Sequence, residues 1–436
     1  MLNKHLTFFK KKLNQIIRIK PFSLYLILSL FSTVLFFLLM PFLGQHGFDW
    51  AVMENNSHFE SADYFLCILF SLGKQNVYLF GIDACYSPLS YALFYWISKT
   101  TSMDTLLKGV NLLSIPYEEL INMTSNLLIS PYQLLAFIIY SIIGILLYVF
   151  AVDELNLTKR KKQLLVFSII FSVPLLFGAV ERGNLTMYVA AFVLIAFKLK
   201  DSPNPVKREI ALILIAISAG LKFYPAFMGL LYLKEKRYKE AGRLIIYGIL
   251  CVFVPFSFFG GLSGLTQLLN SLSALAIQNN YMYRIQFFKG VLTIFGIYGN
   301  LSNLLNTIFI CVLIIFMMMT KNKTRMMTYL AAALAFYPPN AYRYTLLYFL
   351  LPLFTWIEEE SQDGSISNYI SAVLFSCIFS IPTVFGVLTH FKLNFNYYTV
   401  TYVEIFIYLA AWLFFGLQIL YDIKDFSTMY HKKSKS

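Results

Sequence analysis

The stretch ERGNLTMYVAAFVLIAFKLKDSPNPVKREIALILIAISAGLKFYP, residues 181–225, decides the fold of this chain. Two apolar runs, each about one helix long, lie between polar segments at 181–184, 198–208 and 222–225. A charged side chain at the centre of a bilayer costs roughly 2.5–3.5 kcal/mol, so each polar segment marks the end of a membrane span. The middle segment is rich in Lys and Arg, which predicts a cytoplasmic location for it and an outer location for the other two.

Composition predicts the fold class. The chain has 436 residues, of which 58% are hydrophobic and 13% charged, and apolar runs of spanning length recur along it. We therefore expect an all-α, polytopic transmembrane bundle that forms a single integral membrane domain over 1–436. The net charge of +13 marks cytoplasmic loops that face anionic membrane lipids, and it does not indicate nucleic acid binding.

Charged loops predict the topology. The basic, amphipathic segment 1–21 is expected to be a cytoplasmic foot, and the tail HKKSKS is expected to end on the same side. About twelve spans satisfy the alternation of sides. Region 44–131 is predicted to be an outer loop and interfacial region, in which either a second span lies within 105–130 or several helices lie in the interface. Heavy use of Lys, Asn, Ile and Phe suggests an AT-rich genome. We expect a bacterial inner membrane, with the endoplasmic reticulum as the alternative location.

Two pairs of predicted spans are short, around 222–225 and around 337–343. Non-helical backbone at membrane depth is tolerated only where it is buried in protein or lines a water-filled cavity. We therefore predict a hollow in the outer half of the bundle. The polar residues expected to point into it are Asp49, Glu181, Arg182, Asn184, Lys222, Tyr224, Arg284, Tyr337, Asn340, Arg343 and His390.

This set of side chains favours one chemistry. Several cations without a Gly-rich phosphate loop suit a lipid-linked phosphate, which Arg binds bidentately and Lys as a point charge. A carboxylate facing them, Asp49, can take the proton of a hydroxyl nucleophile. The five cysteines are spaced neither for a metal nor as an even set, so we read them as small core residues and predict no metal and no cofactor.

Four short motifs carry a resemblance. They are Phe48-Asp49-Trp50 after the first span, Tyr86-Ser87-Pro88-Leu89, Arg182-Gly183-Asn184-Leu185, and Gly220 to Pro225 with Lys222 at its third position. Their order resembles that of the GT-C superfamily of polyprenyl-phosphate-sugar glycosyltransferases, most closely glycosyltransferase family 87, the α-1,2-mannosyltransferase-like group. The resemblance covers roughly residues 45–345 and includes the late segment 339–344.

The resemblance implies a GT-C-like fold and an inverting hexosyltransferase, with mannose the expected sugar. Asp49 would be the catalytic base. Arg182, Asn184, Lys222, Tyr224, Arg284, Arg343 and Glu181 would bind substrate, with Lys222 on the donor phosphate. The expected partners are a polyprenyl-phosphate-linked sugar donor, a glycolipid or glycan acceptor, and membrane lipids.

Two other functions remain open from the sequence. A flippase or transporter for a lipid-linked sugar would need polar groups on both faces of its path and usually has related halves, and the sequence shows neither. An O-antigen-type polymerase or ligase also uses arginines of the outer face. It would be favoured if Arg284 and Arg343 were essential and Asp49 were not.

Overall fold

The structure, a computed structural model, describes residues 19–49, 62–72, 76–101, 107, 110–128, 130–278, 285–338, 342–361, 363–380 and 399–433. Within these residues the chain is helical and contains no strand. The all-α fold class is therefore confirmed. Residues 1–18 of the predicted foot 1–21, and the segment 381–398, which contains His390, lie outside the described residues.

Five described helices are long and apolar enough to cross a membrane. They are α2 (Pro21–Asp49), α7 (Pro131–Asp153), α12 (Tyr238–Phe253) with η5 (Val254–Ser257), α15 (Gly299–Met319) and α20 (Thr399–Lys433). Each has an exposed apolar face, because only 22% to 44% of its best 18-residue window is buried. These exposed faces are suited to contact lipid.

A sixth candidate span is bent. The apolar run 163–180 would be expected from its sequence to form one helix, but α8 (Lys159–Ile170) and η3 (Val173–Val180) meet at 47°. The break lies at Ser172, whose side chain accepts a hydrogen bond from the Leu175 amide. Pro174 has no N–H to continue the α8 ladder, so the chain starts a new, wider helix there.

Shorter helices fill the interior. They are α9 (Thr186–Leu199), α10 (Pro205–Leu221), η4 (Tyr224–Met228), α11 (Gly229–Lys234), α16 (Lys323–Phe336), η7 (Arg343–Phe349), α17 (Leu350–Glu359) and α18 (Ile366–Phe379). Almost every residue of α9, α16, η7 and α17 is buried. Because they are surrounded by protein, these helices can be shorter than a bilayer is thick.

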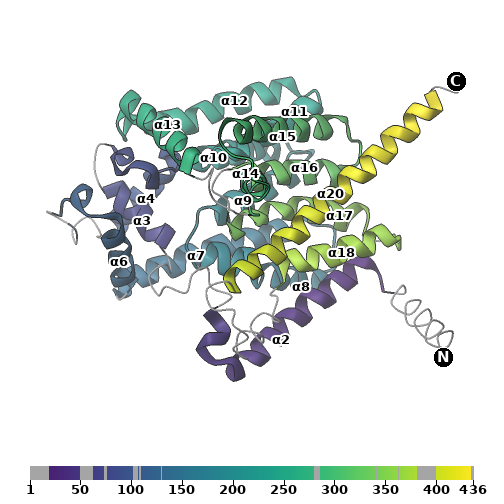
Figure 1. Ribbon diagram of the computed structural model, residues 1–436, viewed down its shortest axis with the longest axis horizontal. Coiled ribbons are helices and arrows are strands. Elements are labelled where there is room, and N and C mark those ends of the chain that lie inside the picture. The colour runs from purple at the N-terminus through teal and green to yellow at the C-terminus, as the bar shows by residue number, and fades with distance from the viewer. Residues whose placement is uncertain are drawn as a thin grey trace.

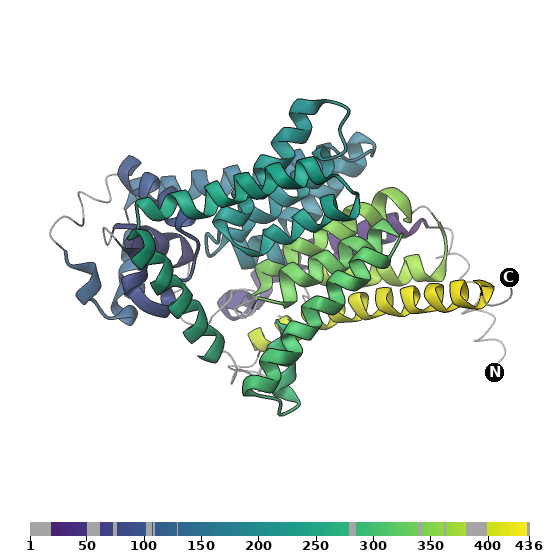
Figure 2. The ribbon, with the colours of Figure 1, turned by 90° about the horizontal axis from the view of Figure 1, so that it is seen from above.

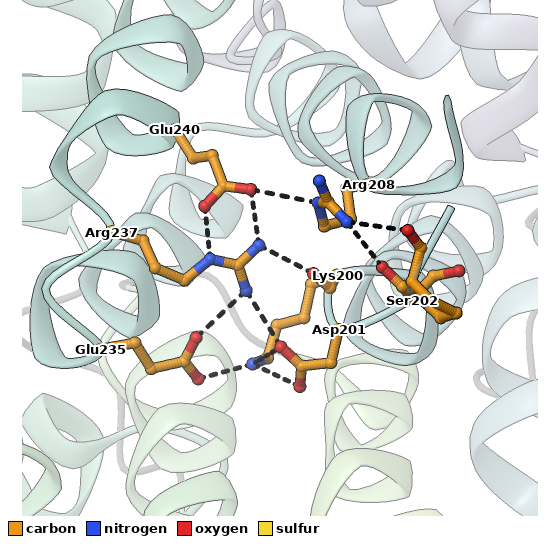
Figure 3. Close-up of polar contacts among 8 residues, drawn as sticks. Lys200, Asp201, Ser202, Arg208, Glu235, Arg237 and Glu240 are labelled. Atoms are coloured by element: carbon orange, nitrogen blue, oxygen red, sulfur yellow. Dashed lines mark hydrogen bonds and ion pairs between the residues drawn. The ribbon is translucent and has the colours of Figure 1, made fainter. Parts of the chain in front are cut away.

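One end of the molecule, which we call the basic end, gathers the loops near 154–159, 200–205, 235–237, 320–322 and 360–365. Ion pairs join them: Lys207–Glu154 (4.0 Å), Lys198–Glu358 (2.5 Å), Lys323–Glu359 (3.0 Å) and Arg325–Asp422 (2.8 Å). Figure 3 shows its centre, where the Arg237 guanidinium contacts Glu240, Asp201 and Glu235. The basic loops predicted to share one side of the membrane therefore share one end of the structure.

The opposite end carries the helices of the predicted outer region. These are α3 (Ala62–Leu72), η1 (Val77–Asp83), α4 (Pro88–Thr100), η2 (Leu112–Ser114) and α6 (Tyr117–Leu128), joined later in the chain by α13 (Gly261–Gln278). The short helix α14 (Phe288–Ile294) lies nearer the middle of the long axis (Figure 1). Figures 1 and 2 both show α3, α4, α6 and α13 together at the end of the long axis away from the end of α20. No described helix between 62 and 130 is long enough to span a bilayer.

Candidate functional site

The turn between η3 and α9 begins the site. Gly183 adopts a left-handed conformation with φ of 63°. An added Cβ there would lie 2.6 Å from the Cβ of Tyr64 and 2.8 Å from the Phe137 ring. Only glycine combines this backbone conformation with such close packing. The turn therefore presents Arg182 and Asn184, on either side of Gly183, to the start of α3.

Asp63 in the first turn of α3 receives both side chains. Arg182 donates two hydrogen bonds, from Nε to Oδ2 at 2.9 Å and from Nη2 to Oδ1 at 2.8 Å. Asn184 donates a third to Oδ2 at 2.7 Å. Burial opposes the ionisation of Asp63, but Arg182 and Asn184 outweigh it and hold the pKa of the carboxyl below its usual value. Asp63 is therefore ionised, and its two carboxylate oxygens hold the side chains of Arg182 and Asn184 in place.

The end of α10 is fixed by α4. Ser87 donates to the carbonyl of Gly220, and Ser90 donates to the carbonyl of Leu221 at 2.7 Å. These bonds satisfy carbonyl groups that a helix terminus leaves without partners. Gly220 is packed closely there, because an added Cβ would lie 2.7 Å from Leu89. The chain then leaves the helix in an extended conformation at Lys222, with φ of −143° and ψ of 130°.

Lys222 points toward the Arg182 turn. Its ammonium donates to Thr186 Oγ1 at 2.8 Å and to Asn184 Oδ1 at 3.2 Å. It also lies 4.9 Å from the ring centres of both Tyr86 and Tyr344. Burial lowers the pKa of Lys222 to about 8, while the charge of Asp63 acts in the opposite direction.

The charges of this group do not cancel. The carboxylate of Asp63 pairs with Arg182, whereas Lys222 donates its hydrogen bonds to the uncharged Asn184 and Thr186. One positive charge is therefore in excess among these three ionisable groups. An anion placed beside Lys222 would balance it.

These residues line a polar cavity of about 230 Å³. Its wall contains Asp63, Arg182, Lys222, Tyr224, Tyr86, Ser87, Tyr342 and Tyr344, together with Cys67 and Cys85. Aromatic faces beside cations are typical of sites that bind polar ligands in a fixed orientation. This cavity can accept a small anionic or hydroxyl-rich group.

An apolar groove of about 940 Å³ adjoins the polar cavity. The two share the lining residues Phe223, Tyr224 and Leu272. Small residues on α10, α11 and α12 open the groove, including Ala216, Gly229 and Gly248. An added Cβ on Gly248 would have no atom within 4 Å, so this glycine faces open space. The combined space suits a ligand with a charged head and a long apolar tail.

The structure brings together four of the residues predicted from sequence: Arg182, Asn184, Lys222 and Tyr224. Two others are not in the described wall of the polar cavity. Glu181 ends η3, and Arg343 is completely buried at the start of η7, where its Cβ packs near Gly178. Arg284 lies outside the described residues. For Asp49 only the backbone, at the end of α2, is described.

Sequence reasoning missed Asp63, Thr186 and Tyr344. Nothing near Asp63 in the sequence indicates that its partner, Arg182, lies 119 positions away. Arg182 could have pointed to Asp63, because a guanidinium placed in a turn between helices needs a carboxylate partner. The described residues contain no group of three His, Cys, Asp or Glu side chains arranged to hold a metal ion.

Comparison with known proteins gives one match. The sequence profile of glycosyltransferase family 87 matches residues 123–356, which is more than half of the chain and includes the Arg182 turn, Lys222 and Tyr344. No curated protein and no solved structure gives a significant match.

Proposed function

Because the chain belongs to glycosyltransferase family 87 and is therefore a glycosyltransferase, we propose that it transfers a hexose, with mannose the expected sugar, from a polyprenyl-phosphate donor to a glycolipid or glycan acceptor. The observation that carries this proposal is the meeting of a cationic cavity with an apolar groove at Phe223, Tyr224 and Leu272.

The groove argues for a lipid-linked donor over a soluble one. Along α12 its wall extends from Ala241 to Phe253, which at about 1.5 Å per residue is roughly 18 Å. A nucleotide sugar has no apolar part to fill such a groove. A polyprenyl phosphate has an apolar tail, which would lie along α12 while its head reaches Tyr224.

Lys222 supports binding of the donor phosphate. Its ammonium carries the excess positive charge of the site and is held by the neutral partners Asn184 and Thr186. When the sugar leaves, the lipid phosphate gains negative charge, which a fixed ammonium stabilises more than it stabilises the bound donor. Arg182 is less free to do this, because Asp63 already takes two of its N–H groups.

A base must also remove the proton of the acceptor hydroxyl. Asp63 is a poor choice, since its pKa is lowered and both of its oxygens accept hydrogen bonds. We therefore propose Asp49, the carboxylate that the family resemblance indicates. In the reaction Asp49 takes the hydroxyl proton, the acceptor oxygen bonds to the anomeric carbon, and the bond from that carbon to the phosphate oxygen breaks. The product is inverted at the anomeric carbon.

The chain path supports a topology of about twelve passes. Six would be α2, α7, the bent pair α8 and η3, α12 with η5, α15 and α20. The other six would be the interior segments α9, α10, η4 with α11, α16, η7 with α17, and α18. By the positive-inside rule we propose that the basic end is cytoplasmic, so that transfer occurs at the outer face of a bacterial inner membrane.

The test is a transfer assay in membranes that contain the full chain, with labelled polyprenyl-phosphate mannose or glucose as donor. We expect transfer by the wild type, loss of at least about a hundredfold with Asp49→Asn, and a comparable loss with Lys222→Ala. Lys207→Ala is the matched control, because this exposed lysine lies at the basic end. Equal transfer by wild type and Asp49→Asn would refute the proposed base. Loss with Arg284→Ala and Arg343→Ala but not with Asp49→Asn would favour the polymerase or ligase alternative.

A further inference from the structure

A second hollow lies at the basic end, away from the polar cavity and the apolar groove. It has a volume of about 1120 Å³ and is formed by the α11–α12 turn, the first turns of α12 and the start of α10. Its lining residues are Arg208, Lys236, Arg237, Tyr238, Lys239, Glu240, Gly242, Arg243 and Ile246. Five of them are cations and one is a carboxylate. The proposed transfer reaction uses none of them.

The single carboxylate of the hollow is already neutralised. Arg237 donates to Glu240 from Nη2 at 2.6 Å and also from Nε, and Arg208 lies 3.7 Å from the same carboxylate. Figure 3 shows this arrangement beside the Lys200–Asp201–Glu235 contacts. Arg243 pairs with Glu209 at 3.2 Å.

Lys236 and Lys239 supply the excess charge. Both are exposed, and within the part of the chain that the structure describes neither forms an ion pair with a carboxylate. The acidic residues around them are engaged by Lys200, Arg208, Arg237 and Arg243. The hollow therefore presents two ammonium groups that an external anion can pair with.

The backbone at Lys236 indicates that the lysine is there for its side chain. Its φ of 58° is left-handed, and no other non-glycine residue among those described has a positive φ. Glycine or asparagine is favoured in this conformation. The turn is held by hydrogen bonds from the Lys236 amide to Leu233 and from the Arg237 amide to Tyr232, at 3.0 and 2.8 Å. A lysine in a conformation that favours glycine or asparagine, on an exposed turn, points to a function of its side chain.

Gly242 keeps the floor of the hollow open. It lies in the interior of α12, where glycine is less favourable than alanine, and an added Cβ would have no atom within 4 Å. No close packing therefore requires glycine at this position. A large side chain there would project into the hollow without a clash.

The position of the hollow determines which anion it meets. α12 with η5 is a candidate membrane span that begins at Tyr238, and on the face of the hollow Tyr238, Ile246 and Leu250 are 51% to 65% exposed. A tyrosine followed by exposed aliphatic residues is typical of a helix that enters the hydrocarbon at that point. The ammonium groups thus lie at the level of lipid headgroups, with apolar surface directly below them.

We propose that this hollow binds the headgroup of an anionic phospholipid, with its phosphate between Lys236 and Lys239 and its acyl chains against Ile246 and Leu250 of α12. Basic pockets between membrane helices bind such headgroups by the same combination of charge and apolar contact. Ala241 and Leu244 on the other side of α12 line the apolar groove, so a bound lipid would also steady one wall of that groove.

The test uses the purified full chain in nanodiscs of phosphatidylcholine, into which phosphatidylglycerol is titrated while a headgroup-labelled phosphatidylglycerol reports binding. We expect saturable binding of phosphatidylglycerol by the wild type. Combined Lys236→Asn and Lys239→Gln should weaken it at least tenfold. The chain should nevertheless be as heat-stable as the wild type or more so in pure phosphatidylcholine, because asparagine relieves the left-handed position.

Gly242→Phe should also abolish saturable binding although every cation is retained, and Gly242→Ala should bind like the wild type. Lys207→Gln, which removes an exposed lysine outside the hollow, is the control and should have no effect. Binding that is unchanged by both Gly242→Phe and the double substitution would overturn the proposal. Displacement of the lipid by millimolar inorganic phosphate would overturn its lipid part, since the acyl chains would then contribute nothing.

Discussion

Replacing Asp63 by asparagine should change the pH dependence of transfer through Lys222. The wild-type ammonium has a pKa of about 8, set by burial and partly offset by the charge of Asp63. Because the donor phosphate needs the protonated amine, kcat/KM of the wild type should fall as the pH rises through about 8. Asp63→Asn removes the offsetting charge, so the fall should occur at a lower pH.

The size of the shift follows from the geometry. The amide of Asn184 bridges the two groups, with 2.7 Å from its nitrogen to Asp63 and 3.2 Å from its oxygen to Lys222. The charges are thus roughly 7 Å apart, and at an effective dielectric constant of about 20 they interact by roughly 2 kcal/mol, or about 1.5 pH units. The alkaline limb should move from about pH 8 to between about 6 and 7.

The assay is the initial rate of transfer at donor concentrations well below KM, between pH 5.5 and about 9.5, because kcat/KM reports the pKa values of the free enzyme. Lys222→Arg is the control. A guanidinium stays protonated throughout this range, so whatever activity the variant retains should lack the limb. An alkaline limb at the same pH in wild type and Asp63→Asn would refute the reasoning, as would a limb that persists in Lys222→Arg.

Three further substitutions test the site. Gly183→Ala should lower the free energy of unfolding by about 1–3 kcal/mol, because the backbone is left-handed there and the added Cβ would contact Tyr64. Thermal unfolding in detergent measures this loss. Gly416→Ala, whose added Cβ meets no neighbouring atom, is the control and should not show it. Arg182→Lys should lose the two-bond contact with Asp63 and reduce transfer at least about tenfold, because Lys cannot reproduce the guanidinium fork; wild-type rates in this variant would show that the pairing is dispensable. Gly248→Phe should fold normally but raise KM for a long-chain donor more than for a short-chain one, because the ring fills the groove; equal effects on both donors would place the lipid elsewhere.

Much of the fold could be predicted from the sequence, because hydrophobic length and the sign of loop charges are local signals. They identified the all-α bundle and grouped the basic loops that the structure joins at one end. They did not predict the bend at Ser172, since an apolar run containing one proline, Pro174, reads as a single span. Local signals also do not show which short helices, such as α16, are enclosed by other helices. The sequence therefore predicts about twelve spans, whereas five or six described helices are long and apolar enough to cross a membrane.

The site was predictable in part for the same reason. Arg182 and Lys222 stand out because each is a charge beside a helix break, which is a local feature. Asp63 begins an ordinary apolar helix, and its role appears only when α3 is packed against the Arg182 turn. The catalytic role of Asp49 stays a prediction, as do the substrate roles of Arg182, Asn184, Lys222, Tyr224, Arg284, Arg343 and Glu181.

The junction at Phe223, Tyr224 and Leu272 has a kinetic consequence. A carrier lipid whose tail occupies the groove has its head in the polar cavity both before and after the sugar is passed on. The polyprenyl phosphate product must leave the groove before a new donor can bind there, so product and donor compete for one site. Added polyprenyl phosphate should therefore slow turnover in a way that more donor overcomes and more acceptor does not.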